Sequence, residues 1–193
     1  MGRGKTGLSV LRYLTKYGHE VVVFDTREGL SFDDWTGIDR VVVSPGLDPA
    51  FPVVAEMLSV AKKHNIPVTS DIELFLDAVR LTSAKTIGIT GSNGKSTVSA
   101  LVYEMLKASL KRVKLGGNFG TPALDVLEEE TEWYVLELSS FQLDLLSLPA
   151  RFTLATVLNI SPNHLDRRRT MEEYRRVKEK IYQGAQNEMG QYS

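Results

Sequence analysis

The stretch Thr86-Ile-Gly-Ile-Thr-Gly-Ser-Asn-Gly-Lys-Ser-Thr97 organises the interpretation of the whole chain. Its β-branched, apolar residues 86–90 predict a short buried strand, and the glycines that follow end it. From Lys95 onward apolar residues recur at helical spacing, so a helix is expected there. A strand, a glycine turn, Lys-Ser and a helix are together typical of a phosphate-binding loop. Position 89 is Ile where the longer form of the motif has a glycine, so only the shorter form is present.

This turn supplies the groups that a nucleotide phosphate needs. Backbone N–H groups of the turn and of the helix N-terminus face the anion. Lys95 can reach the terminal phosphates, and the Ser96 hydroxyl can ligate Mg²⁺. The residues expected around the phosphates are Gly91, Ser92, Asn93, Gly94, Lys95, Ser96 and Thr97. An ordinary strand-to-helix turn is the alternative.

Composition narrows the class of protein. The chain has 193 residues, which suits one large or two small domains, and a net charge of −1. Such a balance favours neither a nucleic acid nor an acidic membrane as partner. There are no cysteines, which excludes disulfides and thiolate metal sites and fits a reducing compartment. No apolar run has transmembrane length, and a signal-peptide core is lacking, so a cytoplasmic protein is expected.

Residues 1–84 predict a first nucleotide-binding unit. Gly2–Gly7 spells G-x-G-x-x-G and leads into a helix expected at 8–17. A buried strand predicted at 20–25 ends in the carboxylate of Asp25, as in the second half of a mononucleotide-binding unit. The motif alone suggests NAD. The strand that should precede the glycines is absent, which predicts an N-terminal truncation of several residues.

The rest of this half alternates strands and helices. Strands are predicted at 40–43 and 68–70, with helices at about 53–64 and from Asp71 onward. This alternation specifies an α/β fold with a parallel sheet, whose ligands lie past the carboxyl ends of the strands. The residues expected at those ends are Thr6, Asp25, Thr26, Arg27 and Ser44–Gly46. Capping of turns is the alternative role for Asp25 and for Asp71.

The domain division follows from the polar segment 81–84. We expect a Rossmann-like domain over 1–84, followed over 85–193 by a partial ATPase domain with a phosphate loop and a parallel sheet.

Polar residues are also expected at strand ends in the second half. A strand predicted at 112–115 runs into Gly116–Gly120, where Asn118 sits among three glycines. That segment allows a close backbone approach to a ligand, or is only a flexible turn. The strand predicted at 133–137 ends in Glu137, a carboxylate placed to hold the Mg²⁺ of a nucleotide on the phosphate loop.

The remaining elements are a helix at 122–128, a strand at 154–158 and a last helix at about 170–182. Lys178 lies on the apolar stripe of that last helix, where a snorkelling side chain is the ordinary explanation. Beyond Gly184 the chain loses periodicity, and no further strand or helix is expected.

Four segments, in their order and spacing, resemble the Mur ligase family: Thr90–Thr97, Gly116–Gly120, Leu136–Gln142 and Asn163–Asp166. The resemblance implies an ATP- and Mg²⁺-dependent ligase with a Rossmann-like domain for a UDP-linked substrate, a central ATPase and a third domain for the incoming amino acid. Segments 25–27, 71–75 and 136–142 further imply UDP-N-acetylmuramoyl-L-alanine and D-glutamate as substrates, hence a role in peptidoglycan synthesis.

The resemblance also implies roles for single residues. Those implied to contact the UDP substrate are Thr6, Asp25, Thr26, Arg27, Gly46, Asn118, Ser139 and Gln142. Those implied to hold Mg²⁺ are Ser96, Glu137, His164 and Lys178. Lys95, Asn118, His164 and Lys178 would serve catalysis, Lys178 as the lysine that this family carbamylates, so a functional role is favoured there over snorkelling.

Three interpretations remain open. The first is the D-glutamate-adding ligase, as a monomer that is expected to have little activity alone because the chain stops before the rest of the central domain and the third domain. The second is another amide ligase of the superfamily, of the Mur or folylpolyglutamate type. The third is a nucleotide-binding module without chemistry. Under the first interpretation we expect neither a nucleic acid nor a membrane as partner.

Overall fold

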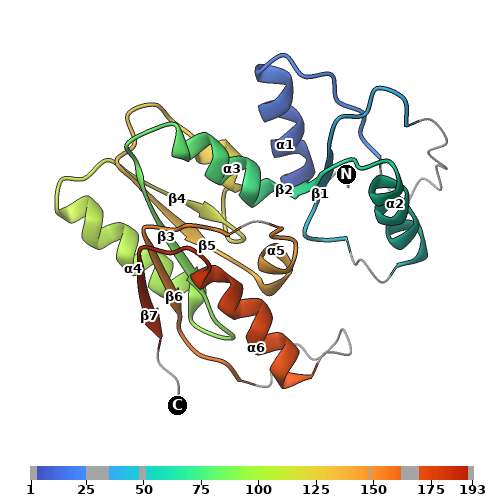
Figure 1. Ribbon diagram of the computed structural model, residues 1–193. Coiled ribbons are helices and arrows are strands. Elements are labelled where there is room, and N and C mark those ends of the chain that lie inside the picture. The colour runs from blue at the N-terminus through green and yellow to red at the C-terminus, as the bar shows by residue number, and fades with distance from the viewer. Residues whose placement is uncertain (1–3, 25–34, 48–50, 148, 162–169, 191–193) are drawn as a thin grey trace.

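The computed structural model describes residues 4–24, 35–47, 51–147, 149–161 and 170–190 (Figure 1). The α-helices in these ranges are α1 (Lys5–Lys16), α2 (Pro52–Lys63), α3 (Asp71–Arg80), α4 (Lys95–Ala108), α5 (Ser140–Asp144) and α6 (Met171–Glu179). The 3₁₀ helices are η2 (Ala123–Val126) and η4 (Lys180–Tyr182). The strands are β1 (Val41–Val43), β2 (Val68–Ser70), β3 (Lys85–Thr90), β4 (Val113–Gly117), β5 (Trp133–Glu137), β6 (Leu154–Val157) and β7 (Asn187–Gly190).

These strands form two parallel sheets. β1 pairs with β2, and the larger sheet has the order β4-β5-β3-β6-β7 with every neighbouring pair parallel. The predicted α/β class is therefore confirmed. Because β3 lies in the middle of the larger sheet, the turn that follows it opens at the centre of the edge where the carboxyl ends meet, which is where parallel sheets bind ligands.

Helices cover both faces of the larger sheet, and β5 shows how its sequence produces this. Tyr134 and Leu136 point to one face and join the cluster that includes side chains of α3, α5 and α6. Val135 points to the other face, where the apolar side of α4 packs. Alternate residues of a strand face opposite sides, so an almost continuous apolar run such as this one can be buried on both.

Helix α3 joins the two halves of the chain. It begins directly after β2 of the small sheet, yet it lies across the larger sheet (Figure 1). The buried ring of Phe75 on α3 meets Tyr134 of β5 edge-on, with 5.1 Å between ring centroids. Arg12 of α1 also reaches Asp125 of η2 at 2.5 Å. The division into 1–84 and 85–193 stays a prediction, because one hydrophobic cluster contains residues from both sides of it.

The strand predicted at 20–25 is not found. Residues 20–24 form no regular element, and Asp25 lies outside the described residues. Val21 and Val23 nevertheless pack against the main hydrophobic cluster. Their apolar pattern indicated burial correctly, but a strand also needs a hydrogen-bonding neighbour, and the described part of the small sheet contains only β1 and β2.

Three other segments differ from the prediction. Strand β7 forms where no element was expected, because its residues pair through the backbone with β6 and need no apolar pattern at a sheet edge. The helix predicted at 122–128 is the short 3₁₀ helix η2. The segment after Glu137, for which no helix was predicted, begins with the short helix α5, whose first turn is capped by Ser139.

Candidate functional site

The turn between β3 and α4 has the backbone that a phosphate loop requires. Gly94 is the N-cap of α4 and has φ +77°, a conformation that glycine adopts without steric cost. A side chain at Gly91 would lie 3.1 Å from Leu158, so a glycine lets the turn pass close to the end of β6. The turn therefore leaves its N–H groups and the N-terminus of α4 at the carboxyl edge of the sheet.

Residues that follow β6 hold this turn. The Asn159 side chain accepts from the backbone N–H of Asn93 at 2.9 Å and donates to its carbonyl oxygen at 3.1 Å. The backbone N–H of Ser161 donates to the Ser92 hydroxyl at 2.9 Å. Sequence reasoning did not find Asn159 and Ser161 as supports of the loop, because their pairing joins residues more than sixty positions apart.

Lys95 lies over its own loop. Its Nζ donates to the carbonyl oxygens of Gly91 and Ser92, at 3.0 and 3.1 Å. An ammonium group at this point can exchange these two carbonyl acceptors for phosphate oxygens, because its stem is flexible and its three donors rotate.

The second part of the site is a carboxylate cluster at the end of β5. Glu137 is only 2% exposed; its Oε2 accepts from the Ser96 hydroxyl at 2.6 Å and its Oε1 from the Asn118 side-chain amide at 2.9 Å. The backbone N–H of Asn118 also donates to the Glu137 carbonyl at 2.8 Å. This close approach of Asn118 to Glu137 requires a glycine at position 117, because a Cβ there would lie 2.3 Å from the Glu137 carbonyl oxygen.

The donor set of this cluster fits a magnesium ion. Among the described residues Glu137 makes no ion pair with Lys or Arg, so its buried charge is held by neutral donors only. A carboxylate and a hydroxyl oxygen are the hard ligands that Mg²⁺ prefers. The described residues contain no group of three or more His, Cys, Asp or Glu placed for a metal. Such an ion would thus take its remaining ligands from water and phosphate, as Mg²⁺ usually does.

Lys178 lies on the other side of the phosphate loop. It is 1% exposed, and its Nζ donates to the Gly91 carbonyl at 2.9 Å and to the Thr90 hydroxyl at 3.4 Å. The same Nζ lies over the face of the Tyr174 ring, 4.7 Å from the ring centroid. Burial, and secondarily the nearby charge of Lys95, lower the pKa of Lys178 to about 8. The side chain is enclosed rather than snorkelling, and more of its amine is neutral near neutral pH than in water.

The structure describes some of the residues named from the resemblance and not others. Thr6 is half-buried in the first turn of α1, and Gly46 is exposed just after β1. Ser139 and Gln142 form the capping box of α5, in which the Gln142 Oε1 accepts from the backbone N–H and the hydroxyl of Ser139. Gln142 is 2% exposed, so its amide is engaged within the fold. The remaining predicted residues, Asp25, Thr26, Arg27 and His164, lie outside the described residues.

The sequence left a ligand-facing role and the capping of a turn open for Asp71, and the structure buries its side chain. It is 2% exposed at the start of α3, and burial raises the pKa of its carboxyl group to about 6, against an opposing hydrogen bond from Gln142. No local pattern distinguishes such a residue from an exposed helix cap, because the partner lies seventy positions away.

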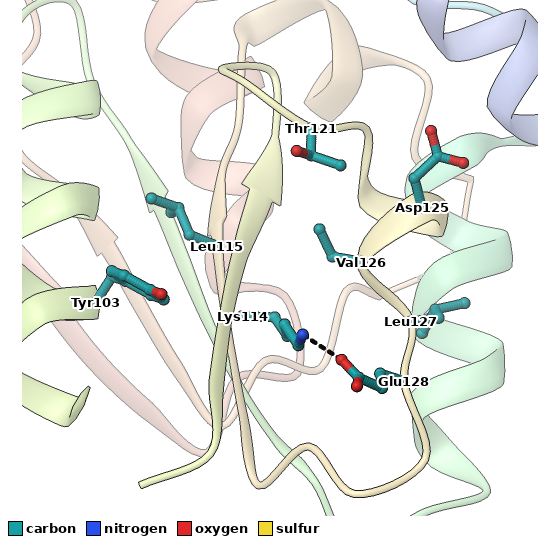
Figure 2. A pocket seen from close by; sticks show the side chains of 8 residues that line it. All are labelled: Tyr103, Lys114, Leu115, Thr121, Asp125, Val126, Leu127 and Glu128. Atoms are coloured by element: carbon teal, nitrogen blue, oxygen red, sulfur yellow. Dashed lines mark ion pairs between the residues drawn. The ribbon is translucent and has the colours of Figure 1, made fainter. Parts of the chain in front are cut away.

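A cavity of about 510 Å³ opens elsewhere, beside the edge strand β4 (Figure 2). Lys114 and Glu128, which form an ion pair, line it together with Tyr103 of α4. Its walls come from α4, β4 and the segment 121–128 and not from the phosphate loop. The cavity is therefore separate from the phosphate loop.

Comparison with known proteins gives a family match and several similar chains. Residues 89–191 match the model of the Mur ligase middle domain. The chain is 42% identical over 207 residues to the UDP-N-acetylmuramoylalanine–D-glutamate ligase of Marinobacter nauticus, covering 97% of this chain and 45% of that protein. It is 44% identical over 206 residues to the ligase of the same name from Legionella pneumophila strain Paris, covering 95% of this chain and 44% of that protein. The chain thus spans about half the length of these relatives.

Among solved structures, a UDP-N-acetylmuramoyl-L-alanyl-D-glutamate–2,6-diaminopimelate ligase aligns with a TM-score of 0.53 and 18% identity. The alignment covers 77% of this chain and 39% of that one, and at this identity it speaks for the fold alone. In the part of the chain that the structure describes, no helix has the length and apolar character needed to cross a membrane.

Proposed function

The chain belongs to the Mur ligase family, and from this premise we propose that it serves the ATP-dependent joining of D-glutamate to UDP-N-acetylmuramoyl-L-alanine in peptidoglycan synthesis. The observation that carries the proposal is the contact of Ser96, at the start of the phosphate-loop helix, with the buried carboxylate of Glu137, 2.6 Å away. The names of the relatives support the choice of substrates.

In the proposed reaction the carboxylate of the UDP-linked substrate attacks the γ-phosphorus of ATP, forming an acyl phosphate and releasing ADP. The amine of D-glutamate then attacks the acyl carbon, loses a proton, and phosphate leaves as the amide forms. Lys95 would turn from the carbonyl oxygens of its own loop toward the phosphates and offset their charge. Asn118, beside Glu137, would contact the reacting carboxyl group of the substrate.

The proposed ligands of a first magnesium ion are Ser96 and Glu137. His164 is the proposed ligand of a second magnesium ion, and Lys178 would supply a further oxygen ligand. When bound, Mg²⁺ would neutralise phosphate charge during transfer. Lys178 would first add CO₂ through its neutral amine and lose a proton, leaving a carbamate oxygen as the ligand. Its lowered pKa favours the neutral amine that this addition needs.

The proposed division of labour follows the predicted domains. Residues 1–84 would hold the UDP end of the substrate, through Thr6, Asp25, Thr26, Arg27 and Gly46, and Ser139 and Gln142 would border the same substrate. Residues 85–193 would hold ATP. We further propose a cytoplasmic monomer with no nucleic-acid or membrane partner, since all of its substrates are small soluble molecules.

The test is binding and turnover with matched variants. Mg·ATP should bind the chain, and Lys95→Ala should weaken that binding at least about tenfold because a charged phosphate contact is lost. Lys62→Ala, an exposed lysine on α2, is the control and should bind like the wild type. Affinity is measured by titration calorimetry, and phosphate release is measured with ATP, D-glutamate and the UDP substrate.

Different results separate the three interpretations. Stabilisation by UDP-N-acetylmuramoyl-L-alanine but not by a folate supports the proposed substrate, and the reverse supports a folylpolyglutamate-type ligase. Stabilisation by Mg·ATP alone, without any response to either substrate, would favour a nucleotide-binding module. No binding of Mg·ATP to the folded wild-type chain would overturn the proposal.

A further inference from the structure

The small sheet continues into the larger half of the molecule without a linker. β2 ends at Ser70 and α3 begins at Asp71. Ser70 is the N-cap of α3 and has an extended backbone, with φ −116° and ψ 169°. α3 itself packs across the larger sheet, through the cluster that contains Phe75 (Figure 1). The direction of the small sheet relative to the larger one therefore depends on the backbone where β2 turns into α3.

Glu73, in the first turn of α3, makes hydrogen bonds on both sides of this junction. Its Oε2 accepts from the Ser70 backbone N–H at 3.0 Å and from the Thr69 hydroxyl at 2.9 Å, both at the end of β2. Its Oε1 accepts from the backbone N–H and the hydroxyl of Ser147, both at 2.7 Å. Ser147 follows α5 in the half that contains the larger sheet. One carboxylate, on a residue that is 5% exposed, thus joins the end of the small sheet to the larger half.

Helix capping explains only one side of these contacts. Glu73 is the third helical residue of α3 and forms a capping box with Ser70. A glutamine caps a helix in the same way, because its single oxygen can accept from the backbone N–H of the N-cap. Its NH₂ group, however, cannot accept from the backbone N–H of Ser147. The second oxygen of a glutamate is therefore needed for the contact with the larger half and not for the cap.

Other contacts between the described parts of the two halves are less directional. The apolar packing of α1 and α3 against the larger half buries surface without selecting one angle. Arg12 of α1 reaches Asp125, but the Arg12 side chain is 60% exposed, and exposed pairs contribute little. The hydrogen bonds of Glu73 are buried and require particular distances and angles. They are the contacts best suited to fix the orientation of the small sheet.

We propose that Glu73 is a positioning residue, which sets the orientation of the small sheet on the larger half and so aligns the two parts of the UDP-substrate site. The inference rests on the proposed function, in which Gly46 and Asn118 contact opposite ends of one substrate. Gly46 lies three residues beyond Val43, which pairs with Ser70. The junction that Glu73 holds is thus at the same edge of the small sheet as Gly46.

A ligand that spans both halves depends on their orientation, whereas a ligand that contacts one half does not. Once the first end is bound, the second contact forms without further loss of freedom only if the other half presents its groups in the matching place. Loss of the Glu73 contact to Ser147 should therefore weaken the spanning substrate selectively.

The experiment compares the affinities of three ligands by titration calorimetry. In the proposed function UDP-N-acetylmuramoyl-L-alanine spans both halves, UDP contacts the first half and Mg·ADP contacts the second. The proteins are the wild type, Glu73→Gln, Ser147→Ala and Asp77→Asn. Asp77 is an exposed carboxylate on the same helix, paired with Arg80, and serves as the matched control.

The orientation of the halves is measured without any ligand, from the distance between two spin labels. The chain has no cysteine, so Glu56→Cys on α2 and Glu104→Cys on α4 provide the only attachment sites. Both positions are exposed. Pulsed electron double resonance gives the distribution of label distances in each variant.

We expect Glu73→Gln to weaken the binding of UDP-N-acetylmuramoyl-L-alanine about fivefold or more, and that of UDP and Mg·ADP less than about twofold. Its label distances should be shifted or more widely distributed. Ser147→Ala removes one of the two donors on Ser147 and should weaken the spanning substrate roughly two- to threefold. Asp77→Asn should resemble the wild type in every measurement.

Wild-type label distances in Glu73→Gln would overturn the proposal. Equal weakening of all three ligands would also overturn it, because a general loss of stability would then explain the effect. If Glu73→Gln does not fold, Ser147→Ala decides by the same two criteria. A wild-type chain that binds neither the UDP substrate nor Mg·ADP would contradict the proposed function, and the label distances would still decide the role of Glu73.

Discussion

Lys178 shows at the scale of one residue how a fold changes the chemistry of a side chain. On the predicted helix it was a cation on an apolar stripe, for which snorkelling is the ordinary explanation. In the structure it is enclosed, with its Nζ 2.9 Å from the carbonyl oxygen of Gly91 in the phosphate loop. Helical periodicity indicates which face is buried, but only the packed neighbours decide whether a charged tip can reach water.

The lowered pKa of Lys178 gives a prediction on pH and stability. Between about pH 8 and 10.5 the unfolded chain holds a proton on this amine that the folded chain has released. The free energy of unfolding should therefore rise with pH across that window, by an amount on the order of 3 kcal/mol, relative to Lys178→Met. Urea unfolding of both proteins in CO₂-free buffers, from pH 7 to 10.5, measures the difference.

Lys62→Met on the surface of α2 controls for the removal of one positive charge. A difference between the wild type and Lys178→Met that stays constant from pH 8 to 10.5 would show that burial does not perturb the amine. CO₂ is excluded because carbamylation would shift the same equilibrium.

At the scale of elements, the turn after β4 depends on a glycine for a reason that the sequence does not reveal. Gly117 and Gly120 both have positive φ, +110° and +76°. A Cβ at Gly117 would collide with the carbonyl oxygen of Glu137, whereas a Cβ at Gly120 would meet nothing within 4 Å. Gly117 is therefore required because a side chain would collide there, whereas Gly120 is required only because its φ is positive.

The two glycines should respond differently to substitution. Gly117→Ala should lower the free energy of unfolding by roughly 3 kcal/mol or more, because strain of the backbone adds to the collision. Gly120→Ala should cost about 1 kcal/mol, from backbone conformation alone. Urea unfolding of the two variants compares them directly, and equal losses would mean that the approach of Asn118 to Glu137 has been placed wrongly.

At the scale of the whole molecule, α3 makes one hydrophobic cluster out of residues from both halves. Phe75 is fully buried, and its ring packs against Tyr134 of the larger sheet. Figure 1 shows α3 lying over that sheet while the strand before it belongs to the small one. The halves should therefore unfold together.

The chain carries a natural reporter in each half, Trp35 and Trp133. In Trp35→Phe and Trp133→Phe the remaining tryptophan should report the same urea midpoint. Phe75→Ala should lower both midpoints equally, with a loss of about 3–5 kcal/mol, because a large buried ring is removed from the shared cluster. Leu81→Ala, at a 90% exposed position just after α3, is the control and should change little.

Two separate midpoints, or a Phe75→Ala variant that shifts only one of them, would show two independent domains with a boundary near residue 84.

Much of the fold could be predicted because its elements follow local patterns. β2, β5 and the start of α4 were found from apolar runs, glycines and helical periodicity. β7 could not be found, since it is held by backbone pairing with β6 and its side chains carry no alternating apolar pattern. The prediction of a strand at 20–25 failed for the opposite reason. The apolar residues of 20–24 are packed, but packing does not by itself create a strand.

The same distinction divides the site. Lys95, Ser96 and Glu137 were recognisable as a set because each follows a local signal, a glycine turn or a strand end, and parallel strands bring their ends to one edge. The support of that set was not recognisable, because it comes from Asn159 and Ser161, which hold the loop. These partners lie about seventy positions apart, and their side chains are of types that caps and turns also use.

The sequence by itself determined the α/β class, the phosphate-loop turn and the likeness to Mur ligases, because these depend on residues that are neighbours along the chain. Only the tertiary structure decided that Lys178 is enclosed beside the loop and that α3 packs across the larger sheet. It alone also placed Glu73, in the first turn of α3, against Ser147 just beyond the end of α5. The physical reason is that burial and hydrogen-bond partnership are properties of the packed chain, set by segments that meet only once both sheets have formed.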